Sequence, residues 1–134
     1  MSEQNESLVR AAYEAYSRGE IAKLLDIIDP GLEWTYLDPS VADPEPQTCH
    51  GREQLQRALE GQAERGLRSE AEEIAACGDK VMVIVHTPGI DRQRVRQADD
   101  RNFLVLTLRN GRVIAMRACR DRAEARDFAG RPGR

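Results

Sequence analysis

The stretch FLVLTLRNGRVIAMRAC, residues 103–119, predicts two long strands joined by a tight turn. Its first part, 103–108, is almost wholly apolar and rich in residues that favour strands. Asn110-Gly111 tolerates the positive φ angles that a two-residue hairpin loop needs. Residues 113–119 follow as the return strand. We therefore expect a hairpin at the centre of a curved sheet, with its inner face forming one wall of a pocket.

The bulk composition points to one globular domain. The chain has 134 residues, and we expect 1–134 to form a single domain with a frayed tail at 130–134. Hydrophobic residues make up 40% and charged residues 32%, a balance that excludes a disordered chain. The net charge of -3 argues against nucleic-acid binding, because proteins that bind nucleic acids usually carry a basic surface.

Several other functional classes are also disfavoured. No apolar run approaches the roughly 20 residues that span a bilayer, so no membrane association is expected. The opening residues, MSEQNES, lack the pattern of a secretion signal, which predicts a cytoplasmic protein. Three cysteines, odd in number and far apart, predict free thiols. The two histidines, His50 and His86, have no ligand-like spacing, so we expect no metal site and no cofactor.

The N-terminal half alternates helices with one strand. Helical spacing of apolar residues predicts helices at 7–18, 20–28 and 51–65. Residues 32–37 predict a strand that carries Trp34 and Tyr36 on one face. Residues 38–50 contain three prolines and predict a loop without regular structure, long enough for a lid or binding loop.

The C-terminal half is richer in strands. Residues 67–77 favour a helix by composition, but the strand at 81–85 needs a hairpin partner, so we expect a strand there. Residues 90–102 predict either an exposed ribbon or a free loop. The arginines of that segment either grip an acidic ligand or protect a sheet edge: Arg92, Arg94 and Arg96. Residues 121–128 predict a short helix capped by Asp121.

This order of elements predicts an α+β fold, in which an antiparallel sheet carries its helices on one face. We expect a cone-shaped roll: a curved, mostly antiparallel sheet wraps around the three helices of the N-terminal half, and a short helix follows at the C-terminus. A curved sheet closed off by three helices leaves a conical hollow.

Six short motifs run almost from end to end of the chain. They are RGE at 18–20, LEWTYLDP at 32–39, HGREQL at 50–55, GDKVMVIV at 78–85, LRNGRVIAMRA at 108–118 and RDRAEA at 120–125. In this order they resemble the nuclear-transport-factor-2-like superfamily, in particular its SnoaL-like polyketide cyclase and ketosteroid isomerase branch. The resemblance implies a cone with one deep pocket and, commonly, a homodimer packed through the outer face of the sheet.

The resemblance also carries expectations for catalytic residues. In the isomerases an aspartate followed by proline is the general base, and Asp38 stands at the corresponding place. The oxyanion-binding tyrosine of those enzymes falls on Ala12, with Tyr13 beside it and Tyr16 one turn further along the same helix face. Their protonated aspartate falls near Leu104, where an acid is absent. Steroid isomerisation itself is therefore not expected.

The same resemblance orients the strands. It turns Met116, Ala118 and Arg120 toward the pocket, beside the neighbouring row Leu104, Leu106 and Leu108. The strand at 81–85 then adds Met82, Ile84 and His86 to the inner face. The expected ligand-binding residues are Tyr16, Trp34, Tyr36, His50, Met82, Leu104, Leu106, Met116 and Arg120. Such a wall is mostly apolar with a few polar groups, as small-molecule sites are.

Each candidate also has a structural role that fits its sequence position. Asp38 is either a general base or a turn residue before proline. His86 is either an acid–base group or a hydrogen-bonded histidine at a strand end. Arg120 either binds a ligand oxygen or pairs with a nearby acidic side chain. Trp34 and Tyr36 either stack on a ligand ring or fill the core, and His50 reaches either the pocket mouth or solvent.

Three functions remain open at this level. The first is a cyclase- or isomerase-type enzyme, in which Asp38 or His86 moves a proton next to a carbonyl on an apolar, ring-containing ligand. The second is a binding module that holds such a ligand without chemistry. The third is an assembly domain whose pocket is filled by its own side chains.

Overall fold

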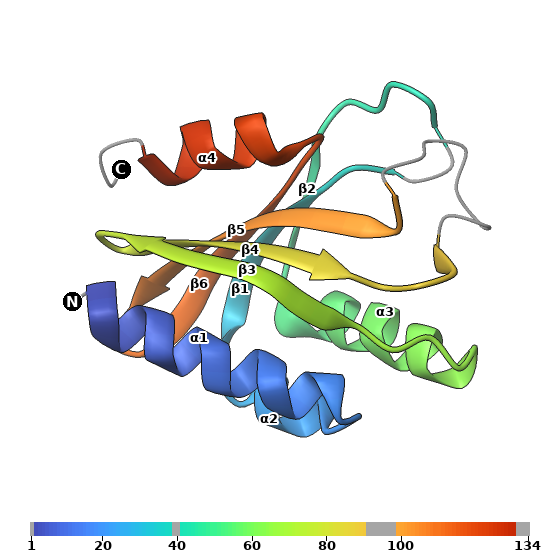
Figure 1. Ribbon diagram of the computed structural model, residues 1–134, viewed down its shortest axis with the longest axis horizontal. Coiled ribbons are helices and arrows are strands. Elements are labelled where there is room, and N and C mark those ends of the chain that lie inside the picture. Colours follow the sequence, from blue (N-terminus) through green and yellow to red (C-terminus); the bar gives the residue numbers. More distant parts are fainter. Residues whose placement is uncertain (1, 39–40, 91–98, 131–134) are drawn as a thin grey trace.

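The computed structural model describes residues 2–38, 41–90 and 99–130 (Figure 1). The helices are α1 (Ser2–Ser17), α2 (Ile21–Leu25), α3 (Arg52–Glu64) and α4 (Arg122–Gly130). The strands are β1 (Ile28–Tyr36), β2 (Gln47–His50), β3 (Glu70–Cys77), β4 (Lys80–His86), β5 (Arg101–Arg109) and β6 (Arg112–Cys119). The predicted arginine ribbon, Arg92, Arg94 and Arg96, and the tail at 131–134 lie outside the described residues.

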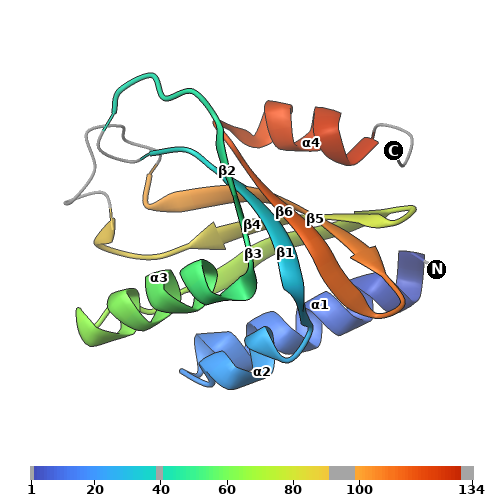
Figure 2. The ribbon, with the colours of Figure 1, turned by 180° about the vertical axis from the view of Figure 1, so that it is seen from behind.

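The strands form one sheet in the order β2-β1-β6-β5-β4-β3. Neighbours pair antiparallel except β1 and β6, which run parallel. Helices α1, α2 and α3 lie on one side of this sheet and α4 on the other (Figures 1 and 2). The α+β cone fold is thereby confirmed. No described helix combines the length and the apolar composition that crossing a bilayer requires.

The hairpin predicted at 103–119 is present as β5 and β6. Its turn residues Asn110 and Gly111 have φ angles of 53° and 76°, the left-handed values that this type of two-residue loop requires. Leu104 pairs with Ala118 and Leu106 with Met116 across the hairpin. The strand expected at 67–77 is also confirmed, since β3 pairs antiparallel with β4.

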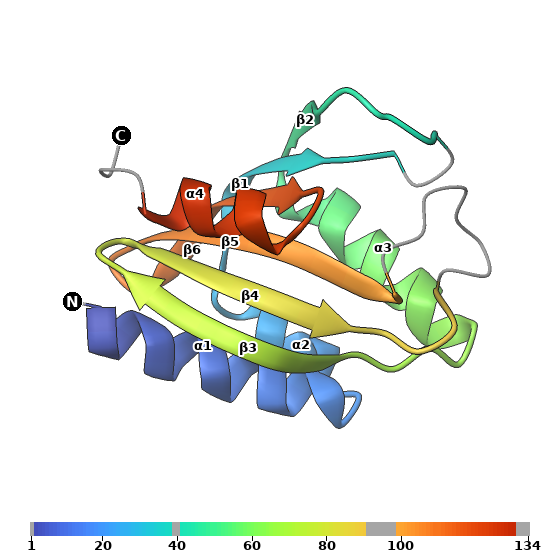
Figure 3. The ribbon, with the colours of Figure 1, turned by 45° about the horizontal axis from the view of Figure 1, so that its top comes forward.

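The sheet buries apolar residues on both faces. On the helix side, the main core joins α1, α2 and α3 to the sheet, and it includes Val9, Leu24, Leu59, Val83 and Leu106. On the other side, a smaller core lies under α4, which crosses β4, β5 and β6 (Figure 3). Phe128 of α4 packs there, beneath the Arg117 guanidinium, which lies 4.0 Å from the centre of its ring.

The predicted orientation of β4 is wrong. Met82 and Ile84 pack in the small core under α4, on the side opposite the pocket. The register explains this, because Val83 pairs with Leu104 and Val81 with Leu106, and paired residues share a face. The sequence misled because every residue from 81 to 85 is apolar, so the strand shows no alternation.

Two other predictions fail around β1. The helix expected at 20–28 ends at Leu25, and Pro30 and Gly31 lie inside β1. The strand accommodates them in an irregularity: from Ile28 to Glu33, β1 advances five residues while its partner β6 advances two. The predicted loop 38–50 also contains a strand, β2, which the sequence hid because its ladder partners on β1 lie more than ten residues away.

The hairpin turn gives a test of the backbone argument. A Cβ added at Gly111 meets no atom within 4 Å, so Gly111→Ala is disfavoured only by its φ of 76°. We expect it to lower the free energy of unfolding by about 1 kcal/mol. Gly61 in α3 is equally uncrowded but helical, so Gly61→Ala should raise that free energy by roughly 0.5–1 kcal/mol. Urea unfolding of both variants measures the difference, and effects of the same sign would contradict the explanation.

Candidate functional site

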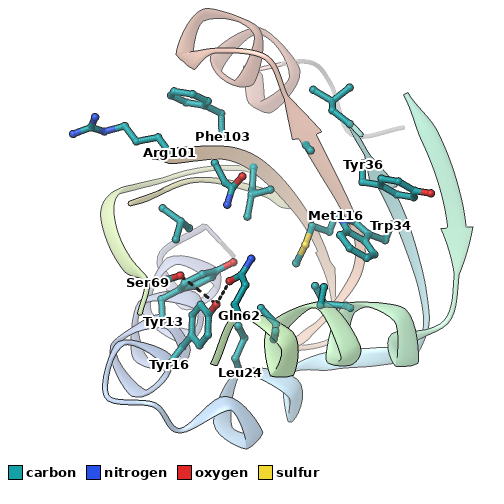
Figure 4. Close-up of a pocket in the computed structure, with 18 of the residues that line it drawn as sticks. Tyr13, Tyr16, Leu24, Trp34, Tyr36, Gln62, Ser69, Arg101, Phe103 and Met116 are labelled. Atoms are coloured by element: carbon teal, nitrogen blue, oxygen red, sulfur yellow. Dashed lines mark hydrogen bonds between the residues drawn. The ribbon is translucent and has the colours of Figure 1, made fainter. Parts of the chain in front are cut away.

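A cavity of about 290 Å³ lies between the sheet and the helices α1 and α3 (Figure 4). Its wall is made by Tyr13, Tyr16, Leu24, Trp34, Tyr36, Leu37, Leu55, Ala58, Leu59, Gln62, Ser69, Val85, Arg101, Asn102, Phe103, Leu104, Met116, Ala118 and Cys119. The volume lies near the lower end of the ~300–1,000 Å³ range of ligand pockets. The hollow predicted from the curved sheet is therefore open rather than filled by side chains.

One wall is aromatic. Trp34 and Tyr36 are two residues apart on β1, so both point to the same side, and their ring centres are 5.2 Å apart. Parallel pairing of β1 with β6 places Met116 directly beside Trp34. Leu104 continues this apolar wall on β5. The result is an apolar, largely aromatic surface suited to a ring.

A chain of polar side chains lies at the opposite end, where α1, α3 and β3 meet (Figure 4). The Tyr16 hydroxyl lies 3.2 Å from Gln62 Oε1 and 3.3 Å from Ser69 Oγ. Ser69 Oγ in turn lies 2.7 Å from Thr87 Oγ1. Ser69 and Thr87 are both buried; Ser69 directly precedes β3 and Thr87 directly follows β4, at the open end of the β3–β4 hairpin.

Tyr13 adds a second hydroxyl at this end. Its side chain is 3% exposed, and its ring meets that of Tyr16 edge-on, with 6.0 Å between the centres. Within the described part of the chain, the Tyr13 hydroxyl makes no hydrogen bond. Figure 4 shows it pointing toward the middle of the cavity. The cavity therefore has an apolar wall on one side and hydrogen-bonding groups on the other.

Five of the predicted ligand-binding residues meet in this wall: Tyr16, Trp34, Tyr36, Leu104 and Met116. Leu106 lies on the same face as Leu104 but is fully buried in the core. Met82 contacts α4 on the other side of the sheet, as described above.

The two predicted proton carriers are not part of the cavity wall. Asp38 follows the wall residue Leu37, and its main-chain carbonyl accepts a hydrogen bond from the Val41 amide at 3.2 Å. His86 ends β4, where Glu70 and Arg101 are its cross-strand neighbours. It shares the face of Met82 and Ile84, so it lies on the α4 side of the sheet.

Arg120 and His50 also lie elsewhere. The Arg120 side chain donates to the Pro44 carbonyl at 2.9 Å and lies 3.3 Å from Asp43 Oδ1. It thereby fastens the loop between β1 and β2 to the end of β6. His50 is exposed at the end of β2, beside Gly51 and away from the cavity wall.

Sequence reasoning missed the polar part of the site. Gln62 belongs to the apolar stripe of α3 that includes Leu55 and Leu59, and a glutamine in such a stripe was the available signal. Ser69 and Thr87 carry no such signal, because only the fold brings them to Tyr16. Among the residues that the structure describes, no three His, Cys, Asp or Glu side chains gather as a metal site would need.

Comparison with known proteins identifies a family and several solved structures that share this fold. A family model for the SnoaL-like domain matches residues 9–116. No protein of curated function matches the sequence. The solved structure of Bal32a, from a soil-derived mobile gene cassette, is similar with a TM-score of 0.64 and 22% identity, and the match covers 97% of this chain and 98% of that one.

Two further solved structures with a similar fold carry names that suggest enzymes. A proposed polyketide cyclase from Xanthomonas campestris has a TM-score of 0.62 and 14% identity, with 96% of each chain covered. A proposed ketosteroid isomerase from Kribbella flavida has a TM-score of 0.58 and 15% identity, with 87% of this chain and 77% of that chain covered. At these identities the likeness shows the fold. Because the family model extends from α1 to β6, this chain belongs to the SnoaL-like domain family of the nuclear-transport-factor-2-like superfamily.

Proposed function

We propose that the protein binds a small, apolar, ring-containing molecule in this cavity and acts on it as a cyclase- or isomerase-type enzyme. The observation that carries the proposal is the Tyr13 hydroxyl, which faces the cavity and makes no hydrogen bond with any described residue (Figure 4). A hydroxyl that faces a cavity without a protein partner can donate a hydrogen bond to a ligand oxygen placed there.

The rest of the wall defines the remainder of the ligand. Trp34 and Tyr36 offer a tilted aromatic surface, and Leu104 and Met116 extend it. Burial of apolar area against such a wall contributes roughly 25 cal/mol per Å². The only charged residue in the described wall is Arg101, whose guanidinium binds the Glu72 carboxylate at 2.6 and 3.1 Å. An uncharged or weakly acidic ligand suits these surroundings best.

The tyrosines supply hydrogen bonds rather than negative charge. Burial raises the pKa of Tyr13 well above its usual value of 10.0. Burial also raises the pKa of Tyr16, and the hydrogen bond from Ser69 opposes this rise. Both hydroxyls therefore stay protonated at neutral pH. Tyr16 donates its proton to Gln62, whereas the Tyr13 hydroxyl can stabilise negative charge that develops on a carbonyl oxygen. Asp38, which follows the wall residue Leu37, is the proposed base for the adjacent proton.

Binding without chemistry is the second candidate. It is favoured by one observation: the described wall contains no carboxylate, imidazole or amine. In that case the Tyr13 hydroxyl would hold the ligand oxygen without proton transfer.

The predicted homodimer is a separate part of the proposal. Its partner would pack on the outer sheet face beside α4, because α4 already covers β4 and β5 there.

Proton exchange on a simple ketone separates the two candidates. In the enzyme hypothesis, the protein accelerates deuterium exchange at the carbon next to the carbonyl of 1-indanone, measured by NMR in heavy water. Asp38→Asn should then slow this exchange by about a hundredfold or more without loss of binding. No acceleration by the unmodified protein would leave binding as the function, and full exchange activity in Asp38→Asn would remove that residue from the mechanism.

Binding itself can be followed through Trp34, the only tryptophan in the chain and a wall residue. We expect its fluorescence to change saturably with 1-indanone, and Tyr13→Phe to weaken binding about five- to tenfold because one hydrogen bond is lost. Ser17→Ala is the control, since its hydroxyl donates to the Glu14 carbonyl on the exposed side of the same helix. Equal affinities of Tyr13→Phe and the unmodified protein would contradict the assigned role of this hydroxyl.

Alkaline pH tests the buried state of Tyr13. Its pKa is raised in the folded protein, so above about pH 10 the unfolded chain loses a proton that the folded chain keeps. The free energy of unfolding should therefore fall as pH rises past 10, by up to about 1.4 kcal/mol per pH unit from this residue. Urea unfolding at several pH values measures the slope. The slope should be smaller in Tyr13→Phe, and an unchanged slope would show that Tyr13 ionises in the folded state.

A further inference from the structure

The hydrogen bonds of the polar chain Gln62–Tyr16–Ser69–Thr87 all run in one donor-to-acceptor direction. The burial of Thr87, at the inner end of the chain, decides which direction that is. Thr87 is 0% exposed, and Ser69 Oγ is the only hydrogen-bond partner of its hydroxyl in the described part of the chain. The Thr87 proton must therefore go to Ser69, since a buried hydroxyl proton without an acceptor is costly. The Ser69 proton then goes to the Tyr16 oxygen, and the Tyr16 proton to Gln62 Oε1.

The opposite order fails at one end. If Gln62 donated to Tyr16, Tyr16 to Ser69 and Ser69 to Thr87, the Thr87 proton would have no acceptor among the described residues. The favoured order satisfies all three hydroxyl protons and fixes the orientation of the Gln62 amide. Its oxygen is taken by Tyr16, and its nitrogen, which makes no hydrogen bond within residues 2–38, 41–90 and 99–130, is left for the cavity.

Figure 4 shows the consequence. The Gln62 nitrogen points from α3 toward the middle of the cavity, on the side where the Tyr13 hydroxyl also points. Both groups line the cavity, and both can donate a hydrogen bond. This end of the cavity thus presents two groups that can donate to a ligand oxygen, and the wall as described offers no carboxylate or imidazole to balance a cationic ligand.

We propose that Gln62 is the residue that sets ligand specificity: its amide nitrogen, oriented by Tyr16, donates to an acceptor oxygen of the ligand and selects carbonyl compounds over amines. The inference rests on the proposed function, because it assumes that the cavity binds an apolar ring. It adds the chemical class of the polar group that the ring must carry. An ammonium group would meet the donor-only nitrogen of Gln62 and lose its hydration without gaining a carboxylate partner in the described wall, so amines are disfavoured.

Three bicyclic probes of one shape test this proposal: 1-indanone, which carries an acceptor oxygen, indane, which carries none, and 1-aminoindane, which is cationic. Trp34 fluorescence gives the three affinities. The unmodified protein should bind 1-indanone about tenfold more tightly than indane and should bind 1-aminoindane least. Equal binding of the amine and the ketone would overturn the proposal.

Gln62→Met is the decisive variant, because methionine keeps the length of the side chain and removes its donors. Its preference for 1-indanone over indane should fall several-fold, with the remainder due to the Tyr13 hydroxyl, while its affinity for indane is kept or improved. Retained indane binding shows that the cavity is folded. Gln54→Met, on the exposed side of the same helix, is the matched control and should keep the preference for the ketone. A Gln62→Met protein that still prefers the ketone tenfold would overturn the proposal.

The side-chain amide signals of Gln62 give a direct second measurement. In ¹⁵N NMR spectra, the pair of signals that disappears in Gln62→Met should shift when 1-indanone is added and stay in place with indane. If these signals do not shift when 1-indanone is added, Gln62 is not the donor to the ketone oxygen and the proposal is overturned. Failure of the proposed function has a different signature, because a protein that binds neither indane nor 1-indanone has no apolar ring site. Equal binding of those two probes keeps the ring site and removes the roles of Gln62 and Tyr13 as donors to the ligand oxygen.

Discussion

The parallel pairing of β1 with β6 is the contact on which the rest of the structure depends. It joins residues about eighty positions apart, and places Trp34 beside Met116 and Thr35 beside Arg117. Without it, β1 and its edge partner β2 would have no place in the sheet, since β1 has no other neighbour. The aromatic wall of the cavity exists because this pairing aligns β1 with the apolar inner row of the β5–β6 hairpin. Such distant contacts are expected to form late in folding, after the local hairpins.

The distance between pairing partners also explains which elements the sequence predicts. The β5–β6 hairpin has its turn, its strands and its register within nineteen consecutive residues, so local chemistry specifies it. The four-residue strand β2 owes its existence to β1 alone. The orientation of β4 depends on its register with β5, because the run VMVIV is apolar on both sides. Local signals thus predicted the fold class, and contacts between distant segments decided the details.

The same contrast applies to the site. Strand periodicity placed Trp34 and Tyr36 on one face, and the family resemblance turned Tyr16, Leu104 and Met116 inward. All five line the cavity. The hydrogen-bonded chain was not predictable, because Tyr16, Gln62, Ser69 and Thr87 come from four separate segments. Asp38 was chosen from the family resemblance and His86 for its chemical type at a strand end. Neither argument specifies where the side chain points. For His86 the apolar run before it concealed the face to which it belongs.

A buried polar chain in an apolar cavity links stability to binding. Folding removes Thr87 and Ser69 from water, and the resulting cost is offset only if each proton finds an acceptor. In the polar chain each hydroxyl donates to the next residue toward the cavity, from Thr87 at the buried end to Gln62. The one group of this chain left without an acceptor among the described residues is the Gln62 amide nitrogen, which lies at the cavity. The group that remains unsatisfied is therefore placed where a ligand can reach it. Selectivity for an acceptor oxygen then follows from the way the core satisfies its hydrogen bonds, because the requirement that orders the interior also orients the amide that the ligand meets.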